Sequence, residues 1–202
     1  MITIVDYGMG NVGSVFNMLR KLRAKVQVTS KPEEIRMADK LILPGVGIFD
    51  KGMTNLRQSG LADVLNEQIL EHQKPILGIC LGMQMMTRGS EEGTLPGLGW
   101  VAADSIKFLP QGNLKIPHMG WNQVSTTPNA RLFDGSAEEQ ERFYFVHSYY
   151  VRADNPAEVA AYCHYSHDFV ASFEVGNIMG VQFHPEKSHV FGMNLFKKFI
   201  AL

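Results

Sequence analysis

The hydrophobic positions in the first ninety residues alternate between a strand period and a helix period. Short β-branched or apolar runs separate stretches in which apolar residues recur three and four positions apart. This alternation predicts strands at 2–6, 25–29, 40–43 and 75–79, and helices at 11–24, 61–72 and 81–88. Repeated strand–helix units indicate parallel strands with helices packed on both faces of the sheet.

The pattern changes in the second half, where strand signals follow one another with few helices between them. They predict strands at 99–108, 114–126, 142–152, 157–164, 168–175 and 178–183, and a closing helix at 191–201. No linker separates the halves, so we predict one α/β domain over residues 1–202. It is a doubly wound, mostly parallel open sheet flanked by helices, with an antiparallel β extension in the second half.

Composition and charge narrow the class of protein. Apolar residues make up 45 % of the chain and charged residues 19 %, which is ordinary for a globular protein. The net charge of −1 lacks the basic excess of a general nucleic-acid binder. With no signal peptide and no apolar run of 18 residues, we expect no membrane partner and a cytoplasmic location in which Cys80 and Cys163 stay reduced.

Chemistry is expected at the carboxyl ends of the strands, where ligands bind in open α/β sheets. At one of these ends, Gly78, Cys80 and Gly82 form the pattern G-x-C-x-G. The glycines allow a sharp strand-to-helix turn, which leaves the cysteine strained, exposed and at a helix N-terminus. There the helix dipole favours the thiolate, and the N–H of Leu81 is placed to bind a developing oxyanion. The alternative is a cysteine that simply ends a buried strand.

A base for this thiol is expected about a hundred residues later, in the segment VQFHPE at 181–186. On a strand, His184 and Glu186 would face the same side, so the carboxylate would hold one imidazole nitrogen while the other faces the sulfur. Cys80, His184 and Glu186 therefore form a candidate catalytic triad. A surface histidine beside a helix-capping glutamate is the alternative.

A third strand end carries the loop Pro44-Gly45-Val46-Gly47. Glycines on both sides of Val46 allow unusual backbone angles and close approach. A loop N–H is therefore able to face an oxyanion from the side opposite the strand-to-helix turn at 78–82, which we call the elbow. An ordinary strand-to-helix turn would explain the same residues.

Two further patterns carry weaker signals. Residues 8–13 match the dinucleotide fingerprint G-x-G-x-x-G, but the second strand ends at residues 29–31 without the acidic residue that this fingerprint requires. Cys163, His164 and His167 form the closest cluster of metal-ligand types, without a zinc-like spacing. We therefore expect no metal here, with the two histidines at an edge or on the surface and the cysteine packed.

The segments GICLGMQ at 78–84 and HPE at 184–186 resemble those of the class I, triad-type glutamine amidotransferases, and the resemblance covers nearly the whole chain. It implies that the thiol attacks the side-chain amide of glutamine, that His184 moves the proton and that Glu186 orients the histidine. It implies no cofactor. By the same resemblance, the bound glutamine contacts Gln84 and the backbone at Gly47, Ser148 and Tyr149.

Four segments narrow the resemblance to members that pass ammonia to a (β/α)₈-barrel cyclase subunit, for use on a nucleotide-derived ribulose phosphate in histidine biosynthesis. They are DYGMGN at 6–11, PHMGWN at 117–122, FYFVHSYY at 143–150 and HPEKS at 184–188. The resemblance implies a heterodimer with Asn11, Trp121, Tyr144 and Lys187 near the docking face. Turn capping for the asparagine, core packing for the two aromatic residues and a solvated lysine are the alternatives.

The resemblance also implies a glutaminase that is weak until its partner binds. A loop N–H beside Val46 that must turn to complete the oxyanion site would explain this. Three rival functions stay open: a glutaminase subunit of another complex, such as the pyridoxal phosphate synthase type; a flavodoxin-like module that binds a phosphate at residues 8–13; and a thiol hydrolase of another substrate.

Overall fold

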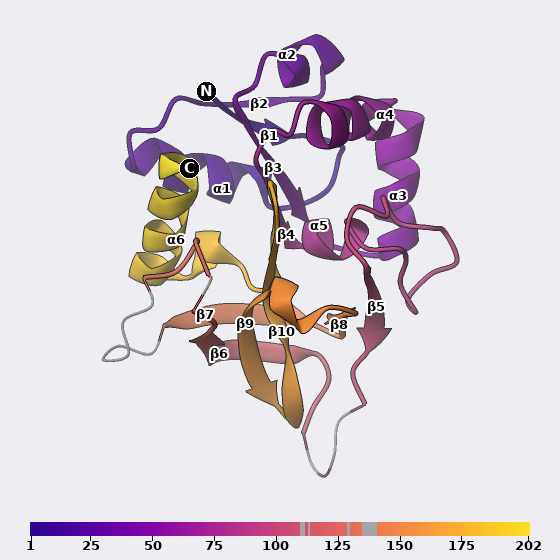
Figure 1. Cartoon of the computed structure of the whole chain (residues 1–202), viewed down its shortest axis with the longest axis vertical. Coiled ribbons are helices and arrows are strands. Elements are labelled where there is room, and N and C mark those ends of the chain that lie inside the picture. Colours follow the sequence, from indigo (N-terminus) through magenta and orange to yellow (C-terminus); the bar gives the residue numbers. More distant parts are fainter. Residues whose placement is uncertain (110–111, 113, 129, 135–140) are drawn as a thin grey trace.

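A computed structural model describes residues 1–109, 112, 114–128, 130–134 and 141–202 around one large sheet (Figure 1). In chain order the strands are β1 (Ile2–Val5), β2 (Val26–Thr29), β3 (Lys40–Gly45), β4 (Ile76–Cys80), β5 (Ala103–Lys107), β6 (His118–Thr126), β7 (Arg142–His147), β8 (Tyr149–Ala153), β9 (Val159–Tyr165), β10 (His167–Val175) and β11 (Ile178–Val181). The α-helices are α1 (Val12–Lys21), α2 (Pro32–Arg36), α3 (Phe49–Gln58), α4 (Leu61–Asn66), α5 (Leu81–Met85) and α6 (His189–Ala201). A π-helical turn η1 (Glu67–Glu71) and 3-10 turns η2 (Pro156–Glu158) and η3 (Pro185–Lys187) complete the elements.

The strand order β2-β1-β3-β4-β11-β10-β9-β6-β7 divides the sheet into two halves. From β2 to β11 the neighbours pair parallel. Beyond β11 they pair antiparallel, and β8 joins β10 to β5 in a further antiparallel ladder. The parallel half lies in the upper part of Figure 1 and the antiparallel half below it. The predicted α/β class with its antiparallel extension is confirmed, and the sheet as a whole is mixed.

Helices cover both faces of the parallel half, with α1 and α6 on one side and α3 and α4 on the other (Figure 1). Each face carries its own cluster of buried apolar side chains. One cluster includes Val5, Leu43 and Phe49, and the other includes Ile4 and Leu19. Successive residues of β1 enter opposite clusters because strand side chains alternate between faces, and a strand buried on both faces is therefore apolar throughout.

The segment after β11 differs from its prediction. The strand predicted at 178–183 ends at Val181, and the chain leaves the sheet for the turn η3. His184 and Glu186 therefore do not lie on a strand, and the argument that placed them on one strand face was wrong. Pro185 suits the turn that follows, because its fixed φ fits the first position of a helical turn, where a missing N–H costs nothing.

Other boundaries differ less. The strand predicted at 142–152 is divided into β7 and β8 at Ser148. Helix α3 was not predicted, although Phe49, Met53 and Leu56 bury one helical stripe. The glycine within that helix weakens the helix signal in the sequence.

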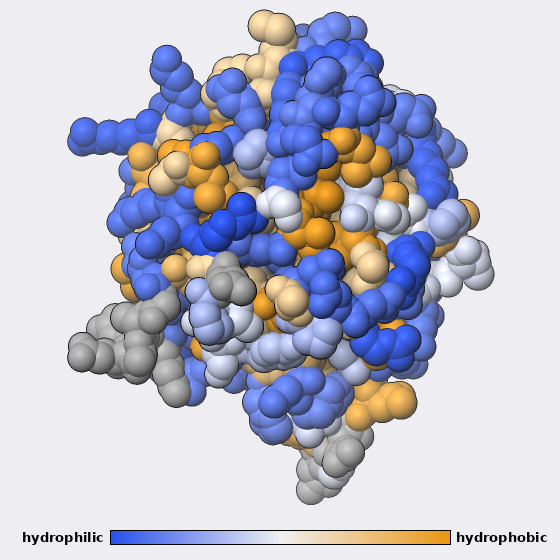
Figure 2. Space-filling view, in the orientation of Figure 1, coloured by the Kyte–Doolittle hydropathy of each residue, from blue (hydrophilic) through white to orange (hydrophobic). Residues whose placement is uncertain are grey.

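The surface adds two observations. No helix in the described ranges is long and apolar enough to cross a membrane. The face seen in Figure 2 is largely polar, with apolar side chains exposed near its middle.

Candidate active site

Cys80 lies at the junction of β4 and α5, and its backbone is strained. Its φ of 53° and ψ of −109° form a combination that residues other than glycine rarely adopt. The strand before it is held on both sides by β3 and β11, and the helix begins at the next residue. The sharp turn predicted from G-x-C-x-G is therefore present. The expectation of an exposed thiol was wrong, since Cys80 is only 8 % exposed.

Glycines around Cys80 allow α5 to pack closely on the sheet. A Cβ added at Gly82 would overlap the carbonyl oxygen of Leu43, and one at Gly78 would lie 2.8 Å from the amide nitrogen of Met83. A Cβ at Gly45 would lie 2.6 Å from the nitrogen of Gly82. These positions require glycine because helix and strand backbones approach each other, while the unusual backbone angle falls on the cysteine itself.

The imidazole of His184 is held by a buried carboxylate. Its Nδ1 lies 2.8 Å from Oε1 of Glu186, and both side chains are 1 % exposed. The turn η3 folds the glutamate back onto the ring. The backbone is fixed as well, because the His184 N–H donates to the carbonyl of Tyr144 and the Ser188 hydroxyl donates to the His184 carbonyl at 2.6 Å.

The protonation of His184 follows from its neighbours. Burial lowers its pKa, but the interactions with Cys80 and Glu186 outweigh burial and raise the pKa to about 10. The ring therefore keeps its second proton at neutral pH. Within the described part of the chain, Nε2 has no partner at hydrogen-bond geometry. Since Nδ1 is engaged by the glutamate, Nε2 is the nitrogen left to face the thiol.

The loop predicted to hold an oxyanion lies against the elbow. Gly45 pairs with Cys80 across β3 and β4, and the Tyr7 hydroxyl donates at 2.8 Å to the carbonyl that precedes this glycine. Burial, followed by the interaction with Cys80, raises the pKa of Tyr7 well above its usual range, so the phenol stays a donor. Val46 is 47 % exposed, and Gly47 has a φ of 121°, where glycine is favoured.

Residues expected at the glutamine pocket are joined by hydrogen bonds to a side chain that contacts the thiol. Gln84 Nε2 donates to the Tyr149 carbonyl at 3.1 Å and to Gln182 Oε1 at 3.0 Å. The same Tyr149 carbonyl accepts from His147 Nδ1 at 2.8 Å. The Ser148 carbonyl accepts a backbone N–H at 2.9 Å. Both carbonyls are thus engaged inside the protein.

Sequence reasoning missed Gln182. This side chain is fully buried, and its Nε2 lies 3.6 Å from the sulfur of Cys80. The signal was present in the segment VQFHPE, where an uncharged polar residue directly follows the apolar run of β11. A buried polar side chain implies a hydrogen-bond partner, and here the partners are in the site.

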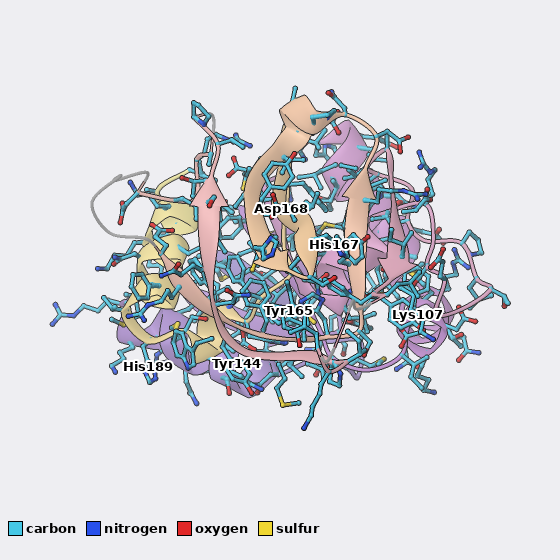
Figure 3. All side chains as sticks on the ribbon, turned by 90° about the horizontal axis from the view of Figure 1, so that it is seen from below. Lys107, Tyr144, Tyr165, His167, Asp168 and His189 are labelled. Carbon is cyan, nitrogen blue, oxygen red and sulfur yellow. The ribbon has the colours of Figure 1, made fainter. Side chains whose placement is uncertain are left out.

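Three of the four interface candidates lie together beside the candidate triad. Trp121 is 47 % exposed and stacks on His189, with ring centroids 5.5 Å apart. Tyr144 meets Trp121 edge-on at 6.4 Å, and the Lys187 ammonium lies 5.6 Å from the Tyr144 ring. Figure 3 shows Tyr144 and His189 on the same side of the molecule. Asn11 precedes α1, and its side chain makes no capping bond, so the capping alternative was wrong.

The three residues considered for a metal site have different surroundings. His164 is exposed and pairs with Asp168 at 2.7 Å, whereas His167 is partly buried against Phe108. Burial, with a smaller effect of Asp168, raises the pKa of Cys163 to about 12, as expected for a packed thiol. In the described ranges, no group of three or more His, Cys, Asp or Glu residues is arranged to hold a metal ion.

The sequence matches the family model "Glutamine amidotransferase class-I" over residues 3–202. The chain belongs to the class-I glutamine amidotransferase family. It is 52 % identical over 202 residues to imidazole glycerol phosphate synthase subunit HisH 2 of Pseudomonas aeruginosa, and the match covers 100 % of both chains. It is 51 % identical over 200 residues to HisH 2 of Methanococcus maripaludis, covering 99 % of this chain and 98 % of that one. Within the class-I family, the chain therefore groups with the HisH subunits.

Solved structures support the same fold. A putative GMP synthase subunit from Thermoplasma acidophilum superposes with a TM-score of 0.70 at 23 % identity, covering 99 % of this chain and 92 % of that one. A further glutamine amidotransferase structure gives a TM-score of 0.76 at 16 % identity, covering 99 % and 97 %.

Proposed function

We propose that this chain is the glutaminase subunit of an imidazole glycerol phosphate synthase, working as one domain in the cytoplasm. It hydrolyses glutamine to glutamate and supplies the ammonia to a cyclase subunit. The observation that carries the proposal is the strained Cys80 beside the His184–Glu186 pair. HisH relatives that match over the full length of the chain support it.

The proposed reaction has two stages. The Cys80 sulfur attacks the carboxamide carbon of glutamine, a C–S bond forms, and the carbonyl electron pair moves to oxygen. When the pair returns, the C–N bond breaks, and His184 gives its proton to the departing ammonia. A water that loses its proton to His184 then attacks the thioester, which releases glutamate and restores the sulfur. Glu186 keeps the Nδ1 proton in place throughout.

The oxyanion is assigned to backbone donors. The Leu81 N–H, at the start of α5, is one donor, and the loop of Gly45, Val46 and Gly47 supplies the other. The exposure of Val46 and the positive φ of Gly47 support a peptide group that turns when a partner docks. Gln84, with the backbone of Ser148 and Tyr149, forms the proposed glutamine pocket.

The ammonia acceptor is the finer part of the proposal. We propose that Asn11, Trp121, Tyr144 and Lys187 dock a (β/α)₈-barrel cyclase. That subunit would use ammonia on a nucleotide-derived ribulose phosphate to form imidazole glycerol phosphate and an aminoimidazole carboxamide ribonucleotide (AICAR). The exposed aromatic stack and the adjacent lysine support a protein partner at this face.

The test is release of glutamate from glutamine, with the chain alone and with a cyclase subunit plus its nucleotide ligand. We expect strong release only in the second case. Equal release without a partner would reject partner-dependent activation. No release in either case, with Cys80 intact, would reject the glutaminase assignment.

A further inference from the structure

We propose that Gln182 is a positioning residue whose single buried amide ties the Cys80 nucleophile to Gln84 of the glutamine pocket. This inference rests on the function proposed above. Gln182 is fully buried at the end of β11, next to β4 in the sheet. Its two amide atoms contact different parts of the site, with Oε1 3.0 Å from Gln84 Nε2 and Nε2 3.6 Å from the sulfur.

The orientation of this amide follows from a carbonyl that only accepts. Gln84 contacts the Tyr149 carbonyl at 3.1 Å, so the contacting Gln84 atom must be the nitrogen. That nitrogen also contacts Gln182, so the facing Gln182 atom must be the oxygen. The remaining amide nitrogen of Gln182 therefore points at Cys80. The sulfur receives a donor, and reversing either amide would oppose two donors or two acceptors.

A second line of hydrogen bonds ends on the same carbonyl. His147 Nδ1 donates to Tyr149, so its Nε2 accepts from His118 Nδ1 at 3.0 Å. Asn122 Nδ2 in turn lies 3.2 Å from His118 Nε2. Burial lowers the pKa of His118 to about 4, and burial is also the main cause that lowers the pKa of His147 to about 3, so both rings are neutral at neutral pH. Both acceptor positions of the Tyr149 carbonyl are therefore filled.

This arrangement has two consequences for the reaction. A hydrogen bond that is donated to the sulfur stabilises the thiolate relative to the thiol. The thiol form would donate its S–H to the Val146 carbonyl, which is 4.0 Å from the sulfur. Both N–H groups of Gln84 are also used within the protein. The amide then presents Oε1 alone to a ligand, an acceptor that suits an N–H of glutamine. Gln182 thus sets the state of the nucleophile and the hydrogen-bonding sense of the pocket.

The test measures the thiolate without any substrate. The rate of Cys80 alkylation by iodoacetamide is followed from pH 5 to 9.5, with the modified peptide identified by mass spectrometry. Cys163 does not interfere, since burial raises its pKa to about 12. In Gln182→Met, which keeps the volume but loses the donor, we expect alkylation at pH 7 to slow by about tenfold, because the thiolate loses a hydrogen bond. The KM for glutamine should rise too, because Gln84 loses its acceptor.

Two further variants keep the test decisive. Gln182→Leu is similar in size and lacks both the donor and the acceptor, so alkylation should slow as it does in Gln182→Met. Gln68→Met removes a buried amide in η1, away from the site, and should leave the alkylation rate unchanged. A wild-type alkylation rate in both Gln182 variants would overturn the proposal. Absence of glutamate release by wild-type protein would reject the glutaminase function without altering the alkylation result.

Discussion

Cys80 and His184 each carry a constraint that an ordinary residue of the fold does not. The cysteine has a positive φ, which costs of the order of 1 kcal/mol or more and persists because strand and helix hold both of its ends. The histidine is buried together with a carboxylate, so its charge is compensated. The chemistry therefore depends on a few atoms of these residues, and the effect of removing them can be measured.

Replacing Glu186 with glutamine tests whether the carboxylate compensates the charge of His184. The carboxylate is one of the groups that raise the pKa of His184, so its loss should lower that pKa and move the alkaline limb of the kcat/KM profile to lower pH. We expect the maximal rate to fall by about tenfold to a hundredfold. The check is the pH profile of glutamate release in the presence of the partner. Glu158→Gln, in η2, should leave the profile in place, and an unmoved profile in Glu186→Gln would contradict the orienting role.

Two packed element pairs bring the site residues together. The elbow requires α5 to lie almost on the backbone of β3, where Gly82 faces the carbonyl of Leu43. In the antiparallel extension, β6 and β7 pair so that His118 lies directly opposite His147. Disturbing the first contact should change how α5 packs on β3. Removing a histidine from the second should change how stability depends on pH.

Gly82→Ala tests the close packing at the elbow, and Gly13→Ala, at a helix glycine with open space around it, is the comparison. A Cβ at Gly82 would overlap backbone, so the helix must move, and we expect a loss of about 3 kcal/mol of unfolding free energy together with loss of glutaminase activity. A Cβ at Gly13 meets nothing within 4 Å, so Gly13→Ala in α1 should stabilise by about 0.5–1 kcal/mol. Urea unfolding measures both. Equal stability of the two variants would contradict the close packing.

The buried histidine pair predicts a pH dependence of stability. Burial lowers the folded pKa of His118 to about 4, below the unfolded value near 6.5. The unfolded chain therefore binds more protons between these values, so this contribution to stability is complete above pH 6.5 and is lost as the pH falls toward 4. Between pH 7 and pH 4, wild-type protein should lose about 3 kcal/mol more unfolding free energy than His118→Phe.

Urea unfolding across this pH range supplies the measurement. His164→Gln removes an exposed histidine of the same extension and should keep the wild-type dependence. If the unfolding free energies of wild type and His118→Phe change in parallel with pH, the prediction that His118 causes this pH dependence is refuted.

At the scale of the whole molecule, the sheet topology assembles the site. β4 and β11 are adjacent and parallel, so residues about a hundred positions apart leave the sheet at the same edge. β3 ends at that edge as well, which brings the glycine loop to Cys80. The proposed docking face lies beside the triad, so a partner at this face is well placed to influence the loop and the imidazole.

Trp121→Ala tests docking. The exposed ring stacks on His189 and presents a large apolar surface, so its loss should weaken binding of the cyclase subunit by about 2 kcal/mol, or roughly thirtyfold. Isothermal titration calorimetry gives the affinity. Met37, 75 % exposed after α2, provides the control, because Met37→Ala removes apolar surface away from the face. Matching affinities for the two variants would remove Trp121 from the interface.

Gly47→Val tests the turning loop. Glycine holds a φ of 121° here, and a β-branched residue would restrict the peptide. The partner-stimulated rate should fall by about tenfold or more, which is a larger change than the loss of glutamine binding, because the oxyanion donor acts in the transition state. Steady-state kinetics with the cyclase and its ligand separate kcat from KM. Equal losses in the two parameters would exclude a loop that acts only in the transition state.

Local patterns in the sequence determined the α/β class, most strand positions and the candidate triad, because strand and helix periods, G-x-C-x-G and HPE are all short-range signals. Tertiary structure decided the rest. The chain left the sheet before His184, yet η3 brought Glu186 to the imidazole by a different geometry. Gln182 acquired its role only when β11 lay beside β4, since an amide's partners depend on which chains meet, and a sequence does not state pairings between distant segments.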